Sequence, residues 1–192
     1  MIKIGKSVSN ISIYTCQPNT NKELKDIIEK RISEEGTECD LNDIDVSKID
    51  DMAYMFAYSS FNGDISKWDV SNVTSMNRMF IDSNFDGDIS KWDVSKVEDM
   101  EGMFCESDFN GDISRWDVSS VENMSGMFEG AIKFNKPIRN WDVSNVKNMQ
   151  WMFNSSKFNQ DISNWNINDD CDTEEMFFDC EIKRAYKPKS LR

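Results

Sequence analysis

Four aspartates recur along the chain at almost constant spacing, at Asp69, Asp93, Asp117 and Asp142. A serine follows each of them after one residue, so each carboxylate can accept the backbone N–H two residues ahead and form an Asx turn. A row of carboxylate oxygens could instead bind calcium. The glycine-rich nonapeptide pattern of calcium-binding repeats is absent, so we favour the turns and predict no metal site.

Basic side chains accompany three of these aspartates. Lys67, Lys91 and Arg115 each stand two residues before an aspartate, so on a strand they would share its face and offset part of its charge. The candidate partner-binding surface therefore consists of Lys67, Asp69, Lys91, Asp93, Arg115, Asp117 and Asp142. A second row, Asp64, Asp88, Asp112 and Asp161, is interrupted by Pro137, and we predict turns there as well.

The composition argues against catalysis. The chain has no histidine, which removes Ser–His–Asp and Cys–His nucleophiles and every histidine-ligated metal site. Its five cysteines are odd in number and include no Cys-x-x-Cys pair, so we expect free thiols in a reducing compartment. Paired carboxylates could hydrolyse glycosides, but carboxylates that recur along a chain do not converge in one pocket. We predict that the protein is not an enzyme and uses no cofactor.

A repeat runs through most of the chain. Tryptophan occurs at 68, 92, 116, 141 and 165, and Met-Phe pairs recur at the same period from Met55-Phe56 to Met176-Phe177. One extra residue lies between Phe128 and Phe134, where we expect a loop insertion. Apolar residues fixed in phase predict units that stack and bury one another's side chains.

The spacing within a unit indicates the elements. Ile65, Trp68 and Val70 are spaced as in a short strand, whereas Val73, Met76 and Met79 favour a helical or 3₁₀ turn. We therefore predict an α/β repeat solenoid of the leucine-rich-repeat type, with six coils of 24 or 25 residues, short parallel strands and helical or 3₁₀ turns. A β-helix without helical segments is the alternative.

The six tryptophans fall into two groups, five in phase with the repeat and one out of phase. The five in-phase tryptophans could form a stacking platform for bases or sugars, but their strict register favours burial in the core. Trp151 is out of phase, at a position held in other units by Arg78, Gly102, Gly126 and Glu175. There it is either a binding anchor or a filler beside a groove lined by glycines, and both alternatives stay open.

The ends of the chain differ from the repeat. The capping box Thr20-Asn21-Lys22-Glu23 and the later Gly36 predict an amphipathic helix over 21–35, and the alternation of Ile2, Ile4, Ile11 and Ile13 predicts a strand or two before it. We divide the chain into a strand and helix cap (1–43), the six-coil repeat (44–182) and a basic tail (183–192). The tail has five basic and no acidic residues, and we predict that it is loosely held.

The repeated string Trp-Asp-Val-Ser-Asn-Val-x-x-Met-x-x-Met-Phe, with Phe-Asn-x-Asp-Ile-Ser, closely resembles the BspA-like leucine-rich-repeat family. This bacterial surface-protein type also occurs in small intracellular and phage-associated proteins. The likeness covers roughly 40–182 and implies a repeat scaffold for binding, with a helical cap and no catalytic residues. Many relatives carry export signals and anchors, which this chain lacks, so we expect a role other than surface adhesion.

The charge of the chain indicates the class of partner. With 22 Lys+Arg against 35 Asp+Glu, its net charge of −13 opposes nucleic-acid binding and favours basic protein surfaces, although acidity also keeps an apolar-rich protein soluble. We expect a cytoplasmic protein-binding module without membrane contact, because no apolar run approaches the ~20 residues of a membrane span. The alternative is a phage-type anti-defence inhibitor, such as an anti-CRISPR, that mimics nucleic acid and blocks the basic channel of a nuclease or CRISPR effector. Pairing of two copies through an open end is a further hypothesis.

Overall fold

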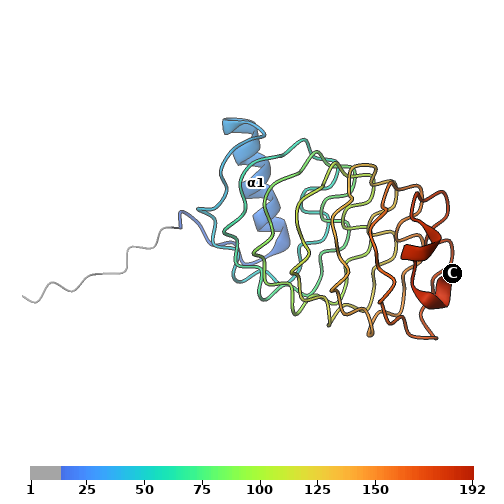
Figure 1. The fold of residues 1–192 in the computed structure, drawn as a ribbon. Coiled ribbons are helices and arrows are strands. Elements are labelled where there is room, and N and C mark those ends of the chain that lie inside the picture. Colours follow the sequence, from blue (N-terminus) through green and yellow to red (C-terminus); the bar gives the residue numbers. More distant parts are fainter. Residues whose placement is uncertain (1–13) are drawn as a thin grey trace, which may run out of the picture.

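The computed structural model describes residues 14–192 (Figure 1). These residues form one α-helix, α1 (Asn21–Glu35), and two 3₁₀ helices, η1 (Arg184–Tyr186) and η2 (Lys189–Leu191), and they contain no strand. The predicted α/β solenoid of six coils with parallel strands is therefore wrong, and the β-helix alternative fails for the same reason. Pairing among the described residues consists of isolated parallel bridges. Most of them join Asp51, Ser75, Asp99, Asn123, Asn148 and Asp172 in succession, and two more join Cys16 to Ile44 and Asp40 to Asp64. The strands predicted around Ile2–Ile13 lie outside the described residues.

Tight turns take the place of the predicted strands. The N–H of Trp68 donates to the carbonyl of Ile65 at 3.2 Å, and the N–H of Val73 donates to that of Val70 at 2.9 Å. These turns still bury Trp68 and Val70, but they leave no extended run long enough for a ladder of paired strands. The predicted helical turns are also absent from the repeat, because the backbone turns left-handed twice in each unit, as at Arg78 (φ 49°) and Asp82 (φ 47°).

Successive units are joined through the segment around each Met-Phe pair, which we call the Met–Phe wall (51–58 in the first unit and its equivalents in the next ones). Every second N–H of this segment donates to a carbonyl of the following unit. At the first junction the donors are Met52, Tyr54, Phe56 and Tyr58, and the acceptors are Ser75, Asn77, Met79 and Ile81, at 2.8–3.0 Å. The same four bonds recur from unit to unit until the N–H of Ser155 reaches the carbonyl of Phe178. All of them point in one direction along the stack.

The core behind the Met–Phe wall is aromatic and continuous along the stack. One column of rings runs from Phe56 through Phe104 to Phe177, with neighbouring centroids 5.4–5.8 Å apart. The in-phase tryptophans are only 4–5% exposed, which rules out a stacking platform. Each indole N–H donates to a backbone carbonyl of the preceding unit, as Trp92 does to Ile65 at 3.2 Å. The extra residue of the repeat forms an outward bulge, where the Ile132 side chain is 58% exposed.

Helix α1 closes the N-terminal end of the stack, and its predicted bounds are confirmed. The Thr20 hydroxyl accepts the N–H of Glu23 at 3.1 Å, and Gly36 follows the last turn with φ 92°. Its buried Leu24 and Ile28 cover the core. The Asn21 amide donates to the carbonyls of Asp51 (3.0 Å) and Ala53 (3.2 Å), which no preceding unit serves.

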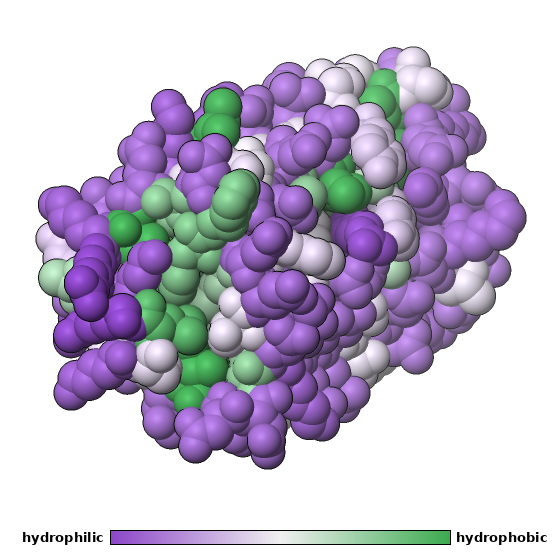
Figure 2. Space-filling model, turned by 90° about the vertical axis from the view of Figure 1, so that its right-hand side faces the viewer, coloured by the Kyte–Doolittle hydropathy of each residue, from purple (hydrophilic) through white to green (hydrophobic). Residues whose placement is uncertain are grey.

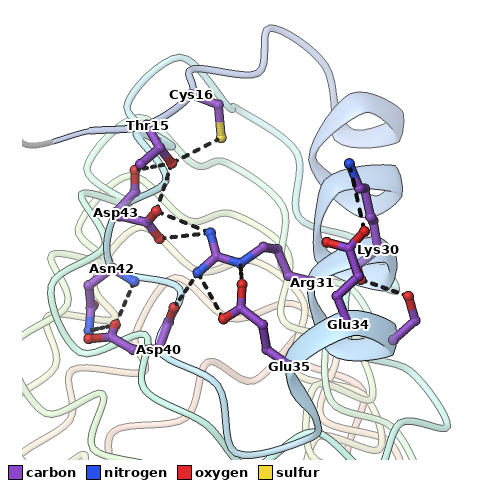
Figure 3. A network of polar contacts seen from close by, with 10 residues as sticks. Thr15, Cys16, Lys30, Arg31, Glu34, Glu35, Asp40, Asn42 and Asp43 are labelled. Carbon is purple, nitrogen blue, oxygen red and sulfur yellow. Dashed lines mark hydrogen bonds and ion pairs between the residues drawn. The ribbon is translucent and has the colours of Figure 1, made fainter.

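One arginine fastens α1 to the first unit (Figure 3). The Arg31 guanidinium pairs with Glu35 at 2.7 Å and with Asp43 at 3.1 Å, and it also donates to the carbonyl of Asp40. Asp43 accepts a further bond from the Thr15 hydroxyl at 2.7 Å. The hydrogen bonds from Thr15 and Arg31 hold the pKa of Asp43 below its ordinary value, so the pair stays charged at neutral pH.

The basic tail is folded against the last unit, so the prediction of a loose tail is wrong. Ile162 donates its N–H to the carbonyl of Tyr186 at 3.0 Å, and the ammonium of Lys187 lies 4.8 Å from the ring centroid of Phe177. Tyr186 and Leu191 pack against the core. Coverage is incomplete, because hydrophobic residues are exposed between hydrophilic ones on this end of the molecule (Figure 2), and Phe178 is 62% exposed.

The central ring column predicts where the stack is most sensitive. Phe104 is fully buried and lies 5.7 Å from the ring centroids of both Phe80 and Phe128. Phe104→Ala should lower the free energy of unfolding by about 3–5 kcal/mol, because it leaves a cavity between stacked units. Phe178→Ala, at an exposed site, should change it by less than about 0.5 kcal/mol. Urea unfolding followed by tryptophan fluorescence measures both, and equal losses would contradict the stacked core.

Candidate functional site

The aspartate row forms the predicted turns. The Oδ1 atoms of Asp69, Asp93, Asp117 and Asp142 each accept the backbone N–H of the serine two residues ahead, at 3.1 Å. In the first three, the same atom also accepts the serine hydroxyl at 2.6–2.7 Å. The bonds from Ser95 hold the pKa of Asp93 below its ordinary value, because they stabilise the charged carboxylate.

The outer oxygens of this carboxylate row stay unused. Within residues 14–192, the Oδ2 atoms of Asp69, Asp93, Asp117 and Asp142 have no hydrogen bond or ion pair. All four side chains are exposed, and so are Lys67, Lys91 and Arg115. The row is therefore a set of carboxylates that are fixed by their turns and open to a partner on the outside.

The basic residues lie beside the second aspartate row instead of the first. Lys67 helps to lower the pKa of Asp64, Lys91 that of Asp88, and Arg115 that of Asp112, after the larger effect of the serine turn at each carboxylate. The prediction that these cations offset the charge of the Asp69 row rested on a strand, and the turn at residues 65–68 redirects them. In the unit where Pro137 interrupts the second row, Arg139 reaches the Asp161 carboxylate of the following unit.

Metal binding finds little support in this arrangement. Over residues 14–192, no three carboxylate or thiol side chains come together in a geometry that could hold a metal ion.

A third row of turns, which the sequence analysis missed, uses Asp51, Asp99, Asn123, Asn148 and Asp172. Its members are Asp in some units and Asn in others, which hid the pattern, although each accepts the N–H two residues ahead.

Trp151 lines a groove in the Met–Phe wall with a volume of about 260 Å³, which we call the Trp151 groove. Its floor follows one register position through four units, in the order Arg78, Gly102, Gly126 and Trp151. The Arg78 stem lies over Gly102, where an added Cβ would meet its Cγ at 3.0 Å. The Glu129 carboxylate lies over Gly126, where an added Cβ would meet Oε2 at 3.2 Å, so it occupies the part of the floor next to Trp151.

The backbone of the groove floor is left-handed throughout. Gly102 (φ 57°) and Gly126 (φ 58°) adopt this conformation without strain, but Trp151 adopts it as well, with φ 55°. A bulky side chain in this region costs about 1–3 kcal/mol. Trp151 is 39% exposed, and its Nε1–H donates to the Glu175 carboxylate at 3.1 Å, which restrains the ring.

The charges in the groove are unevenly matched. Arg78 pairs with Glu101 at 2.5 Å and donates to the Tyr54 hydroxyl at 2.8 Å. The charges at the end of the groove opposite Trp151 therefore balance. The Glu129 carboxylate has no hydrogen bond or ion pair within residues 14–192, and burial together with the charge of Glu106 raises its pKa. Burial and these carboxylates also raise the pKa of the Cys105 thiol to about 12, which keeps it protonated and unreactive.

Comparison with known proteins places the chain in a family. Residues 23–108 and 83–187 match the model described as "Mycoplasma protein of unknown function, DUF285". The chain belongs to the DUF285 family. No curated protein and no solved structure matches it. The resemblance of this DUF285 member to BspA-like repeats stays a prediction.

Across residues 14–192, no helix has the length and apolar character needed to cross a membrane.

The turn role of the carboxylate row can be separated from a calcium role. Asp93→Ala removes two hydrogen bonds from Ser95 and should lower the free energy of unfolding by about 1 kcal/mol, whereas Asp93→Asn keeps the Oδ1 acceptor and should cost less. Thermal melting with calcium and then with a chelator should give the same midpoint for the unaltered chain. A calcium-dependent midpoint that Asp93→Asn abolishes would contradict the turn role.

Acid should weaken the stack through the second row. Hydrogen bonds from the serine two residues ahead hold the pKa of Asp64, Asp88 and Asp112 below their ordinary values. Such carboxylates stabilise the fold above their unfolded pKa, near 3.9, and lose that contribution as the pH falls through the folded pKa. The melting temperature should therefore fall between about pH 5 and about pH 3, and Asp88→Asn should show a shallower fall. Identical pH profiles would refute the assignment.

Proposed function

We propose that the protein is a non-enzymatic binding module that recognises a basic protein partner through its acidic surface. The observation that carries the proposal is the carboxylate row of Asp69, Asp93, Asp117 and Asp142. One oxygen of each is held by a turn and the other has no partner in residues 14–192. Carboxylates fixed before binding lose little entropy when a partner arrives, which improves affinity.

The repeat gives this row its suitability for a protein partner. Carboxylates at one position of each unit offer the same contact repeatedly along a rigid surface, as extended binding surfaces of repeat proteins do. The net charge of −13 attracts basic proteins from a distance and raises their association rate. Lys67, Lys91 and Arg115 lie beside the second aspartate row and would reject partners that place cations next to them.

The cytoplasm is the compartment that we propose for this activity. All five cysteines are unpaired, at Cys16, Cys39, Cys105, Cys171 and Cys180. Unpaired thiols suit a reducing compartment, in which disulfides do not persist.

The alternative is an anti-defence inhibitor that mimics nucleic acid. The observation that favours it is again the regularity of the rows, since carboxylates at repeated intervals on a rigid body resemble a series of phosphates. Such an inhibitor would occupy the basic channel of a nuclease or CRISPR effector. It differs from the first proposal in the identity of the partner and uses the same surface.

Affinity capture from a bacterial lysate, at low and at high salt, tests the proposal. A variant with Asp69, Asp93, Asp117 and Asp142 changed to Asn keeps the Oδ1 acceptors of the turns and loses four charges. We expect the unaltered chain to retain basic proteins at low salt and release them at high salt, and the variant to retain at most about a tenth as much. The matched control changes four exposed acidic residues elsewhere, Glu29, Glu34, Glu38 and Asp50, to amides.

Each outcome of the capture has a clear meaning. Equal capture by the two four-site variants would show that the carboxylate row has no special role and would refute the proposal. Captured proteins that bind nucleic acid and are displaced by added DNA would favour the mimicry alternative. Captured basic proteins that DNA does not displace would favour the general binding module.

A further inference from the structure

The Trp151 groove combines features that the carboxylate row lacks. The row is flat and exposed, whereas the groove is a hollow with a glycine floor, an aromatic side and a half-buried carboxylate. Its volume of about 260 Å³ lies below the usual range for drug-sized ligands and matches one long side chain.

The chemistry of the groove selects a cation. The Glu129 carboxylate has no partner in residues 14–192, and it lies over Gly126, the floor position of the unit before Trp151. Among the described residues, Arg78 is the one cation that lines the groove; it is already paired with Glu101 and lies three units away from Trp151. An incoming positive charge would therefore meet an unmatched negative charge next to the face of an indole ring, which attracts cations.

The fixed ring favours arginine over lysine. The bond from Trp151 Nε1 to Glu175 restrains the partly exposed ring, so the ring is already oriented before a ligand binds. A guanidinium is planar, stacks on aromatic rings and can bond a carboxylate through two N–H groups, whereas an ammonium is a compact, strongly hydrated charge. The absence of side chains at Gly102 and Gly126 leaves room for the apolar stem of the arginine.

We propose that the Trp151 groove is the docking slot for one arginine side chain of the partner, with its guanidinium stacked on Trp151 and paired with Glu129. The proposal rests on the function proposed above and adds a specific anchor for the partner in the Met–Phe wall. The carboxylate row would supply attraction along the length of the partner, and the groove would fix its register. It also assigns Trp151 the role of a binding anchor instead of a filler.

The test uses a defined probe, the tripeptide acetyl-Gly-Arg-Gly-amide, and the full chain labelled with ¹⁵N. The indole N–H signal of Trp151 is assigned by its loss in Trp151→Phe. We expect saturable shifts of this signal with the arginine peptide and none with the citrulline peptide, which has the same shape but no charge. Glu129→Gln should weaken binding of the arginine peptide by about tenfold.

Two controls keep the test decisive. Glu129→Gln should melt at the same or a higher temperature than the unaltered chain, because it removes a charge that burial disfavours, so a loss of binding cannot be ascribed to unfolding. The matched variant Glu38→Gln removes an exposed charge outside the groove and should bind the arginine peptide as the unaltered chain does.

The outcomes separate this proposal from the function on which it rests. Shifts that are absent, equal for citrulline, or unaffected by Glu129→Gln would overturn the arginine slot and leave the lysate capture as it stands. The variant with four Asn residues in the carboxylate row should keep the peptide response. If it loses that response, the peptide binds the row and the slot is refuted.

Discussion

Each repeat unit before the last presents four backbone N–H groups in its Met–Phe wall that carbonyls of the following unit accept. Buried N–H groups without acceptors are costly, so a unit cannot be stable alone and must be completed by its neighbour. The aromatic core obeys the same constraint, since each indole N–H donates backwards to the preceding unit while the wall donates forwards. Hydrogen bonds of opposite direction therefore lock adjacent units into one register.

This register creates the surface on which function would depend. Because the units follow one another at a fixed offset, a residue type repeated in the sequence becomes a row on the molecule, as with Asp69, Asp93, Asp117 and Asp142. A residue that departs from the repeat becomes a single different side chain within a row of otherwise similar residues. Trp151 is such a residue, and its backbone has the left-handed conformation that this position has in every unit.

The sequence predicts well which residues are buried and where the turns lie, but it predicts the secondary structure of the repeat poorly. Period and alternation were sufficient to place the tryptophans inside and to assign Asp93 to a serine turn, because both depend on residue types at fixed local offsets. The α1 boundaries followed from Thr20 and Gly36 for the same reason.

The predicted strands and helical turns failed for a different physical reason. Left-handed residues such as Arg78 and Trp151 are not glycines, so nothing in their type announces a positive φ. The Glu129 carboxylate was likewise missed, since its isolation depends on Arg78 being engaged by Glu101, a contact between units. The role of the basic tail could not be predicted either, because charge alone does not show that Tyr186 and Leu191 pack on the core.

The one-way bonding of the Met–Phe wall makes the two ends of the stack chemically unlike. At the C-terminal end the N–H groups of Thr173, Glu175, Phe177 and Asp179 have no acceptor within residues 14–192, whereas at the opposite end Asn21 of α1 covers the carbonyls of Asp51 and Ala53. Two copies brought tail to tail would confront donors with donors. Because Asn21 of α1 already donates to these carbonyls, they are not free to accept the donor groups of a second copy.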